Sequence, residues 1–474
     1  MKFFSTRDHS RIVTASQAIA QGLSDEGGLF VPERFPQVDV RALCQLDYPT
    51  LAAAVVSEYL TDYSKDFLAE AARATYGEAF GGKAGYLAPV EGDTYALELW
   101  HGPTCAFKDY ALQLMPKLLV EAKKNLSRTE KTLILVATSG DTGKAALDGY
   151  HDIPGVEIAV FYPTGGTSEI QRLQMATQEG ANVAVYAVRG NFDDAQTGVK
   201  KVFGDKAIAA RLAERNIRLS SANSINWGRL VPQIVYYFYG YLRAVERVGE
   251  EVVFAVPGGN FGNAYACWVA KKMGLPIMRL IVCTNENDAM DEFLRTGRYA
   301  PKPSSETIAT SSPSTDISRA ASFERFLFDV LGRDGARVRE LAEDLKTKGE
   351  FTLTAEEFRK VRLSGVVSGS SNHPNRLEII EQMHLEYDTY VDPHTADALF
   401  SGIYLHPVGV KTLCVETVQA VKFPRMVRQA TGVAVEPPED MADLFSRPLR
   451  KVQTPACEAA VREEIERLTE RPDA

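Results

Sequence analysis

A lysine stands directly before a predicted helix in the segment Trp100–Pro116, WHGPTCAFKDYALQLMP. Ala111, Met115 and Leu118 repeat at helical spacing, which places Lys108 at the N-terminal end of that helix. The positive end of the helix dipole disfavours a cation at this position. A lone lysine there most often extends its amine into solvent. Lys108 by itself therefore leaves two interpretations open, a solvated side chain or an amine held in place for chemistry.

The strongest signal for a binding site is the turn VPGGNFGN, Val256–Asn263, which closes an apolar strand and opens a helix. Glycines in such a turn let backbone N–H groups converge on an anion at the helix N-terminus. The spacing fits neither the dinucleotide fingerprint nor the P-loop. The turn therefore predicts a phosphate site, with a plain tight turn as the structural alternative.

Two further turns offer polar donors. TSGDTG, Thr138–Gly143, presents hydroxyls and amides suited to a small anion such as a carboxylate. SANSINWGR places Asn223, Ser224, Asn226 and Arg229 just before a helix, and hydroxyls with a guanidinium fork are suited to a phosphate. Each turn alone could equally be a helix cap. Two phosphate-type sites, one carboxylate-type site and a lysine form a more restrictive set.

The elements around these turns predict the fold. Apolar strands alternate with helices in Thr132–Tyr150 and again in Glu251–Asn285, which is typical of a parallel, doubly wound sheet. We therefore predict an α/β fold with two doubly wound parallel-sheet subdomains facing a cleft, plus a helical N-terminal region. Pro301–Ser318 is rich in serine and proline and is expected to form a long loop that covers the site. The predicted divisions are a mainly helical domain (1–98), a catalytic core (99–430) and a charged helical tail (431–474).

Composition narrows the functional class. The net charge of −9 and the absence of an arginine-rich stripe argue against a nucleic-acid partner. No apolar run has the length of a signal peptide core or a membrane span. The six cysteines form no C-x-x-C pair, and the seven histidines show no metal-binding spacing. We expect a cytoplasmic enzyme without a metal, acting as a monomer or homodimer on a small molecule.

The segments HGPTCAFKD, ATSGDTG, SANSIN and VPGGNFGN, in this order, resemble the threonine synthase family of yeast and enteric bacteria. That family consists of pyridoxal 5'-phosphate (PLP) enzymes of the tryptophan-synthase β-like fold, fold type II. The resemblance extends from STRDHS and QGLSDEGGLFVPE near the N-terminus to about Pro424.

The resemblance implies roles for individual residues. Lys108 would be the catalytic residue and form the Schiff base with PLP, while TSGDTG would cover the ring and take the substrate carboxylate. The phosphate of the substrate, O-phosphohomoserine, would lie against Asn223, Ser224 and Arg229. The implied cofactor-binding residues are Lys108, Asp141, Gly258, Gly259, Asn260, Phe261, Gly262, Asn263 and Thr417. The implied substrate-binding residues are Thr138, Ser139, Thr142, Asn223, Ser224 and Arg229.

One segment departs from the family pattern. In ETVQAVKFP the family's His-Pro pair is replaced by Gln419 and Ala420, although Thr417 remains to face the ring nitrogen. Ser322 stands where an asparagine is expected. It also stays open whether His394 contacts a ligand or packs, and whether Gln419 lines the cleft.

The function favoured by these observations is the conversion of O-phosphohomoserine and water to threonine and phosphate, by γ-elimination and water addition at Cβ. Lys108 would remove the α-proton and then move protons at Cβ. Three alternatives remain: a phospho-lyase giving 2-oxobutanoate, a serine or threonine dehydratase, and a PLP-binding pseudoenzyme.

Overall fold

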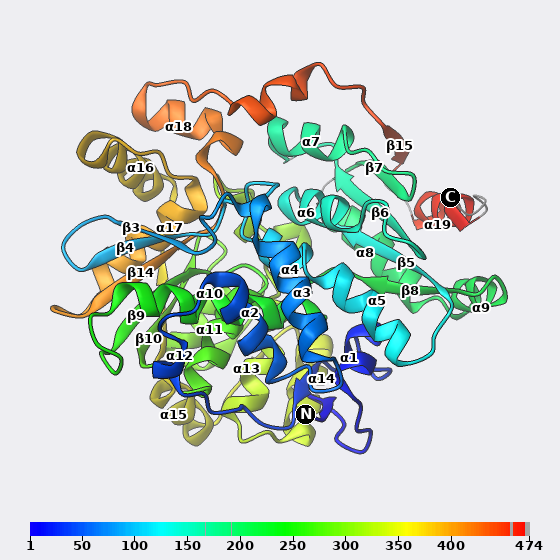
Figure 1. Ribbon diagram of the computed structural model, residues 1–474, viewed down its shortest axis with the longest axis horizontal. Helices are drawn as coiled ribbons and strands as arrows, with labels where there is room; N and C mark the ends of the chain where they lie inside the picture. The colour runs from blue at the N-terminus through cyan, green and yellow to red at the C-terminus, as the bar shows by residue number, and fades with distance from the viewer. Residues whose placement is uncertain (166, 191, 456–457, 470–474) are drawn as a thin grey trace.

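The structure is a computed structural model that describes residues 1–165, 167–190, 192–455 and 458–469. Two β-sheets lie on opposite sides of the molecule in Figure 1, a five-stranded sheet on the right and a six-stranded sheet on the left. Helices cover both sheets, as expected for strands that are apolar on both faces. Among the described residues, no helix is both long enough and apolar enough to cross a membrane.

The five-stranded sheet is parallel throughout, with the strand order β15-β7-β6-β5-β8. Its strands are β5 (Lys131–Ala137), β6 (Val156–Pro163), β7 (Val183–Arg189), β8 (Ile217–Ser221) and β15 (Lys451–Pro455). The helices on or next to it are α5 (Met115–Asn125), α6 (Asp141–Tyr150), α7 (Glu169–Ala176), α8 (Phe192–Gly204), α9 (Lys206–Glu214) and α19 (Glu458–Thr469).

The six-stranded sheet has the order β13-β10-β9-β14-β4-β3 and is parallel except for its edge pair β3–β4. Its strands are β3 (Tyr86–Pro89), β4 (Thr94–Glu98), β9 (Val252–Pro257), β10 (Ile277–Thr284), β13 (Val366–Ser370) and β14 (Lys411–Glu416). The helices packed around it are α10 (Trp227–Ala244), α11 (Gly262–Lys272), α12 (Ala289–Thr296), α15 (Ala355–Leu363), α16 (His373–Tyr387), α17 (Pro393–Leu405) and α18 (Pro424–Thr431).

The remaining elements surround the cleft-forming sheets. The short helix α4 (Asp109–Leu112) packs between α6 and α10. The N-terminal region contributes β1 (Phe3–Ser5), β2 (Phe30–Pro32), α1 (Ala15–Gln21), α2 (Tyr48–Ser57) and α3 (Lys65–Tyr76). Further along the chain lie β11 (Arg298–Tyr299), β12 (Phe351–Thr352), α13 (Phe323–Val330) and α14 (Gly335–Thr347).

The predicted fold class is confirmed, and two details differ from the expected element types. Residues 86–98, expected to be helical, form the β3–β4 pair at the edge of the six-stranded sheet. Lys451–Pro455, expected in a helical tail, adds a strand to the other sheet. Both differences involve a short strand at a sheet edge, β3 or β15, with little buried surface, so the sequence carries only a weak strand signal there. The divisions at residues 98 and 430 stay predictions.

Helix α10 anchors the core between the sheets. Asn226 caps its N-terminus by accepting a hydrogen bond from the Gly228 amide. Its residues are buried on nearly every face, including Trp227 and the adjacent Tyr236 and Tyr237. A helix that is buried on nearly every face has little solvent-facing surface, so it belongs in the interior of a large protein. This helix places several site residues, as described below.

Candidate active site

A cleft lies where the carboxyl ends of β5, β8, β9 and β14 meet. Ligand sites of parallel α/β sheets occur at this edge. The predicted residues that line the cleft are Lys108, Thr138, Ser139, Thr142, Asn223, Ser224, Arg229, Gly258, Gly259, Asn260, Gly262, Asn263 and Thr417. Two predicted residues, Asp141 and Phe261, are not among the lining residues.

Lys108 occupies the N-cap position of α4 and its side chain lines the cleft. Burial lowers the pKa of Lys108 to about 8, even though the nearby Asp141 carboxylate acts in the opposite direction. Because its pKa is lowered, this amine is neutral in a larger fraction near pH 8 than an ordinary lysine. Lys108 is half-buried in the wall of the cleft, which favours the second interpretation, an amine held in place for chemistry.

Internal hydrogen bonds fix the loop that presents Lys108. The buried Asp109 carboxylate accepts from the Thr104 amide at 2.8 Å and from the Thr104 hydroxyl at 2.6 Å. The Phe107 amide donates to the carbonyl of Thr417 at 2.8 Å, which ties this loop to the end of β14. The position of the lysine therefore depends on Thr417 through the main chain.

Asp141 lies behind the cleft rather than in its wall. Its carboxylate pairs with Lys422 at 2.8 Å, and both side chains are fully buried. Burial raises the pKa of Asp141, but the charges of Lys422 and Lys108 outweigh that effect and lower it to about 2. The pair joins the start of α6 to the segment that follows β14, so Asp141 is positioned to orient this wall and not to contact a ligand.

The glycine loop between β9 and α11 has the geometry of an anion cradle. The amides of Gly259, Asn260 and Gly262 have no hydrogen-bond partner among the described residues, and these residues line the cleft. Gly259 has φ +54°, a conformation that favours glycine. Unpaired amides at a helix N-terminus attract negative charge.

Asn263 adds a directed side-chain donor to this cradle. The hydroxyls of Tyr236 and Tyr237, both on α10, donate to its Oδ1 atom. Its Nδ2 atom is buried and has no partner among the described residues, while Asn263 lines the cleft. Because Oδ1 already accepts two hydrogen bonds, Nδ2 is free to donate to an acceptor in the cleft.

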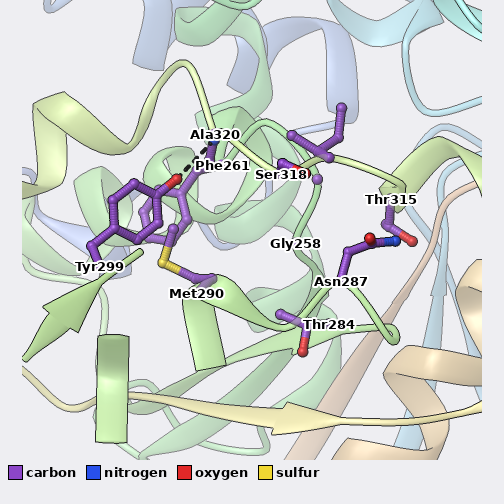
Figure 2. A pocket seen from close by; sticks show the side chains of 11 residues that line it. Gly258, Phe261, Thr284, Asn287, Met290, Tyr299, Thr315, Ser318 and Ala320 are labelled. Carbon is purple, nitrogen blue, oxygen red and sulfur yellow. Dashed lines mark hydrogen bonds between the residues drawn. The ribbon is translucent and has the colours of Figure 1, made fainter. Parts of the chain in front are cut away.

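Phe261 explains how the loop reverses. It adopts a left-handed conformation with φ 65°, and its ring packs against Phe323 and Phe326 on the side away from the cleft. Figure 2 shows this ring near Met290 and Tyr299 in a second, smaller pocket behind the loop. The Phe261 side chain therefore supports the loop from behind.

The turn TSGDTG is held by its own first residue. The hydroxyl oxygen of Thr138 accepts hydrogen bonds from the amides of Gly140 and Gly143, each at 3.0 Å. This contact shapes the turn, so that Ser139 and Thr142 line the cleft beside it. Of the three residues predicted to bind the substrate carboxylate, Thr138 both lines the cleft and stabilises the turn.

Arg229 supplies the only buried guanidinium that lines the cleft among the described residues. It extends from the first turn of α10 and donates from Nη1 to the Ala222 carbonyl at 2.8 Å, while its Nε has no partner. Burial lowers the pKa of Arg229 to about 10, so it remains charged at neutral pH. With Asn223 and Ser224 beside it in the wall, a buried cation without an acidic partner points to an anionic ligand.

His394 lines the cleft but both of its ring nitrogens are engaged. Nδ1 lies 2.6 Å from the Asp392 carboxylate, and Nε2 accepts from the Ser314 amide at 3.0 Å. These contacts favour the packing interpretation, because the ring holds the 301–318 loop against the cleft. Gln419 does not line the cleft. Its main-chain amide donates a hydrogen bond to the Cys105 carbonyl at 3.2 Å.

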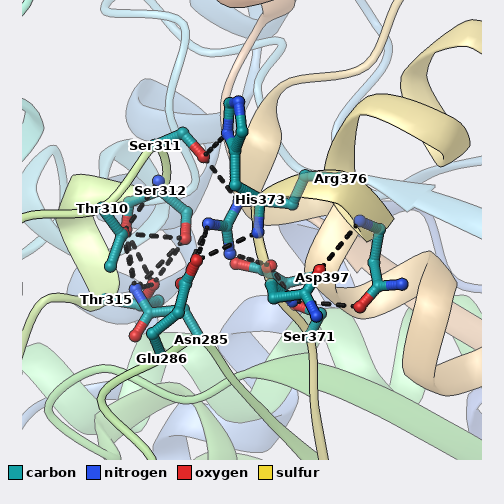
Figure 3. Close-up of polar contacts among 12 residues, drawn as sticks. Asn285, Glu286, Thr310, Ser311, Ser312, Thr315, Ser371, His373, Arg376 and Asp397 are labelled. Atoms are coloured by element: carbon teal, nitrogen blue, oxygen red, sulfur yellow. Dashed lines mark hydrogen bonds and ion pairs between the residues drawn. The ribbon is translucent and has the colours of Figure 1, made fainter.

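The 301–318 loop forms one wall, as expected, and a polar network anchors it. Arg376 is fully buried and forms ion pairs with Glu286 and Asp397 at 2.7 and 3.1 Å. Its Nε also donates to Ser311 at 2.8 Å, and Asn285 contacts the same loop (Figure 3). The loop is therefore fastened to the large sheet beside the cleft.

Several lining residues were not predicted from the sequence. They are Phe107, Ala137, Phe192, Gln196, Gln233, Pro257, Ser314, Thr315, Ile317, His394 and Val418, of which His394 was left open. Phe192 and Gln196 come from α8, whose sequence shows no site motif. Gln233 follows Arg229 by one helical turn, so its position was accessible from the spacing alone.

The site defines a class of protein. A lysine, an amide cradle and a buried arginine line one cleft at the carboxyl edge of parallel sheets, and the free Asn263 Nδ2 and loop amides fit the phosphate of PLP. A family model described as pyridoxal-phosphate dependent enzyme matches residues 87–349, and one described as threonine synthase N terminus matches residues 2–76. The chain is a PLP-dependent enzyme of the α/β class.

Individual relatives show which family of PLP-dependent enzymes the chain belongs to. The threonine synthase of Methylobacillus glycogenes is 41% identical, over 95% of this chain and 96% of the relative. The structure of PLP-bound threonine synthase from Brucella melitensis matches with a TM-score of 0.92 and 33% identity, over 99% of this chain and 100% of that chain. The yeast threonine synthase structure matches with a TM-score of 0.90 and 31% identity, over 98% of each chain. The chain belongs to the threonine synthase family, and its cofactor is PLP.

Proposed function

We propose that this enzyme converts O-phospho-L-homoserine and water to L-threonine and inorganic phosphate. The observation that carries the proposal is the pair of anion sites that share one cleft with Lys108, one made of loop amides and one centred on Arg229. A cofactor and a substrate that each bear a phosphate require two such sites. The family relatives support synthase activity over the phospho-lyase, the dehydratase and the pseudoenzyme.

On the cofactor side, the glycine loop Gly258–Asn263 would hold the phosphate of PLP through its amides and Asn263 Nδ2. Thr417 would face the ring nitrogen with a neutral hydroxyl. When bound, PLP withdraws electrons from the α-carbon of an attached amino acid. Asp141 would act through its ion pair with Lys422, and Phe261 through packing behind the loop.

On the substrate side, Asn223, Ser224 and Arg229 would bind the phosphate, and Ser139 and Thr142 would bind the carboxylate. Thr138 would keep the second turn in shape. Binding both ends of the substrate fixes Cα and Cβ relative to the lysine. The same contacts would retain the phosphate after it leaves Cγ.

Lys108 would move the protons of the reaction. Its Nζ, with a pKa lowered to about 8, can accept the α-proton and later exchange protons at Cβ. One base suffices because the two carbons are adjacent. Water then adds at Cβ and gives the threonine hydroxyl.

The altered segment after β14 is compatible with this function. Gln419 contacts the lysine loop through its main chain, and Thr417 accepts from Phe107 through its carbonyl. Neither contact needs the histidine and proline side chains of the family pattern. The replacement therefore leaves the backbone that presents Lys108 in place.

The direct test incubates the PLP-loaded enzyme with O-phospho-L-homoserine and measures phosphate, threonine and 2-oxobutanoate together. Equal amounts of phosphate and threonine are expected. Phosphate with 2-oxobutanoate would make the enzyme a phospho-lyase, and no phosphate would contradict the proposed substrate. We further propose a cytoplasmic location and a monomeric or homodimeric state, which fractionation and light scattering measure.

A further inference from the structure

The first turn of α13 lies between the two anion sites. The Ser322 amide donates to the carbonyl of Asn260, in the glycine loop, at 3.0 Å. The Ser322 hydroxyl lies 3.1 Å from the carbonyl and 3.2 Å from the hydroxyl of Ser224, in the loop before α10. One fully buried residue thus contacts both loops.

Arg325, one helical turn after Ser322, hydrogen-bonds to the same loop before α10. Its Nη1 donates to the Ser224 carbonyl at 3.2 Å and its Nη2 to the Ile225 carbonyl at 2.5 Å. Its Nε donates to the Phe30 carbonyl in β2 at 3.0 Å. The side chain is fully buried, and its hydrogen-bond acceptors among the described residues are all main-chain carbonyls. Burying a cation among neutral partners lowers the stability of the fold. We therefore attribute the role of Arg325 to geometry, because its planar guanidinium fixes the positions of the carbonyls that it contacts.

The two loops are also in direct contact. A Cβ atom on Gly262 would lie 3.0 Å from the Cβ of Ser224, closer than most real contacts of this kind. The loops can therefore approach only because Gly262 lacks a side chain. Any displacement of the Ser224 loop changes the distance between the two anion sites.

We propose that Ser322 and Arg325 are positioning residues that set the substrate-phosphate loop at a fixed distance from the cofactor-phosphate loop. They act through Ser224 and Ile225 and contact neither ligand. Arg325 also links this loop to β2, so the N-terminal region, residues 2–76, takes part in substrate binding through it. The inference rests on the proposed substrate site at Asn223, Ser224 and Arg229.

Arg333 offers a matched control. It follows α13 and donates to the carbonyls of Pro32 and Glu33, so it too joins this part of the chain to the N-terminal region. It has no contact with the Ser224 loop among the described residues. A variant at Arg333 thus reports the general effect of loosening the N-terminal region.

The experiment measures kcat, KM and PLP affinity for the holoenzymes of Ser322→Ala, Arg325→Met, Arg325→Lys and Arg333→Met, together with the binding of inorganic phosphate by calorimetry. Arg325→Met is expected to raise KM and to weaken phosphate binding by about 10-fold, with PLP affinity changed by less than about twofold. Ser322→Ala should raise KM by about threefold and spare PLP binding, because the Ser322 amide still reaches Asn260. Arg325→Lys should restore part of the loss, and Arg333→Met should leave KM unchanged.

The proposal is overturned if Arg325→Met and Arg333→Met change KM equally, or if PLP affinity falls in parallel with substrate affinity. If Arg325→Met does not fold, Ser322→Ala decides, and an unchanged KM in that variant overturns the proposal. Failure of the wild-type enzyme to release phosphate would contradict the proposed function instead. In that case weaker binding of inorganic phosphate to Arg325→Met than to Arg333→Met would still support the positioning role.

Discussion

The two anion sites in the cleft use different kinds of donor. The glycine loop offers main-chain amides and one amide side chain, and two buried tyrosines orient that side chain. The second site offers hydroxyls and amide groups around a buried guanidinium that has no acidic partner. The first is neutral and held by the scaffold, whereas the second carries a full charge.

This difference matches two different tasks. A resident phosphate needs a rigid cradle whose unpaired donors are already held in position by the scaffold, because little ordering is then left for binding. A phosphate that arrives on the substrate and leaves as a free ion needs a strong charge that attracts it in each turnover. The comparison predicts that variants will separate cofactor affinity from substrate affinity.

Lys108→Ala should have the largest effect, because the lysine shares the cleft with both sites and serves the reaction itself. We expect phosphate release from O-phosphohomoserine to fall by ~10³-fold or more. Lys124→Ala, which changes an exposed lysine on α5, should match the wild type. Wild-type rates in Lys108→Ala, measured by a phosphate assay, would show that another residue moves the protons.

Arg229→Met should separate the two sites most clearly. Loss of the buried guanidinium is expected to raise KM by about 10²-fold, since hydrogen bonds to charged groups contribute about 1.5–3 kcal/mol each. PLP affinity should stay near the wild-type value. The control is Arg243→Met, on the same helix α10 but outside the cleft lining, where Arg243 stacks on the Tyr239 ring and makes long hydrogen bonds to the carbonyls of Cys44 and Leu46. Equal losses of substrate and PLP affinity in Arg229→Met would show that the two anion sites do not serve different ligands.

Tyrosine variants test the cofactor side in graded steps. Tyr236→Phe or Tyr237→Phe alone leaves one donor on Asn263 Oδ1, so PLP affinity should fall by less than about threefold. The double variant frees the Asn263 amide to rotate and should weaken PLP binding by about 10-fold, as should Asn263→Ala. Fluorescence titration of the cofactor-free enzyme with PLP measures this. A raised KM without a change in PLP affinity would assign Asn263 to the substrate instead.

Local patterns in the sequence predicted most of this site. VPGGNFGN and TSGDTG each follow an apolar strand, SANSINWGR begins in the more polar strand β8, and parallel strands bring such turns to one edge of a sheet. The fold class followed from the same alternation of strands and helices. The family resemblance added PLP and the role of Lys108.

Contacts between segments that are far apart in the chain could not be predicted from the sequence. Asp141 pairs with Lys422 across 281 positions, and Arg325 reaches Ser224 across 101. Nothing local marks Asp141 as an ion-pair residue or Phe261 as a packing residue, although both lie inside site motifs. Motif membership therefore identified the correct turns but not the direction of each side chain.

The smallest expected effect concerns stability and pH. Burial lowers the pKa of Lys108 from 10.5 to about 8, so between these values the unfolded chain binds more protons than the folded protein and stability rises with pH. Below pH 8 the cofactor-free enzyme bears the full cost of the buried cation. Lys108→Met should then increase the free energy of unfolding at pH 7 by on the order of 2 kcal/mol.

That gain should shrink as the pH rises from 8 to 10.5, because the wild-type amine loses its charge in the folded state. Urea denaturation of both cofactor-free proteins across this range measures it, with Lys124→Met as the exposed control that should show no such trend. A gain that does not vary with pH would assign the effect to packing rather than to charge. A pH-dependent gain would mean that Lys108 destabilises the fold that holds it, as expected for a group retained for its chemistry.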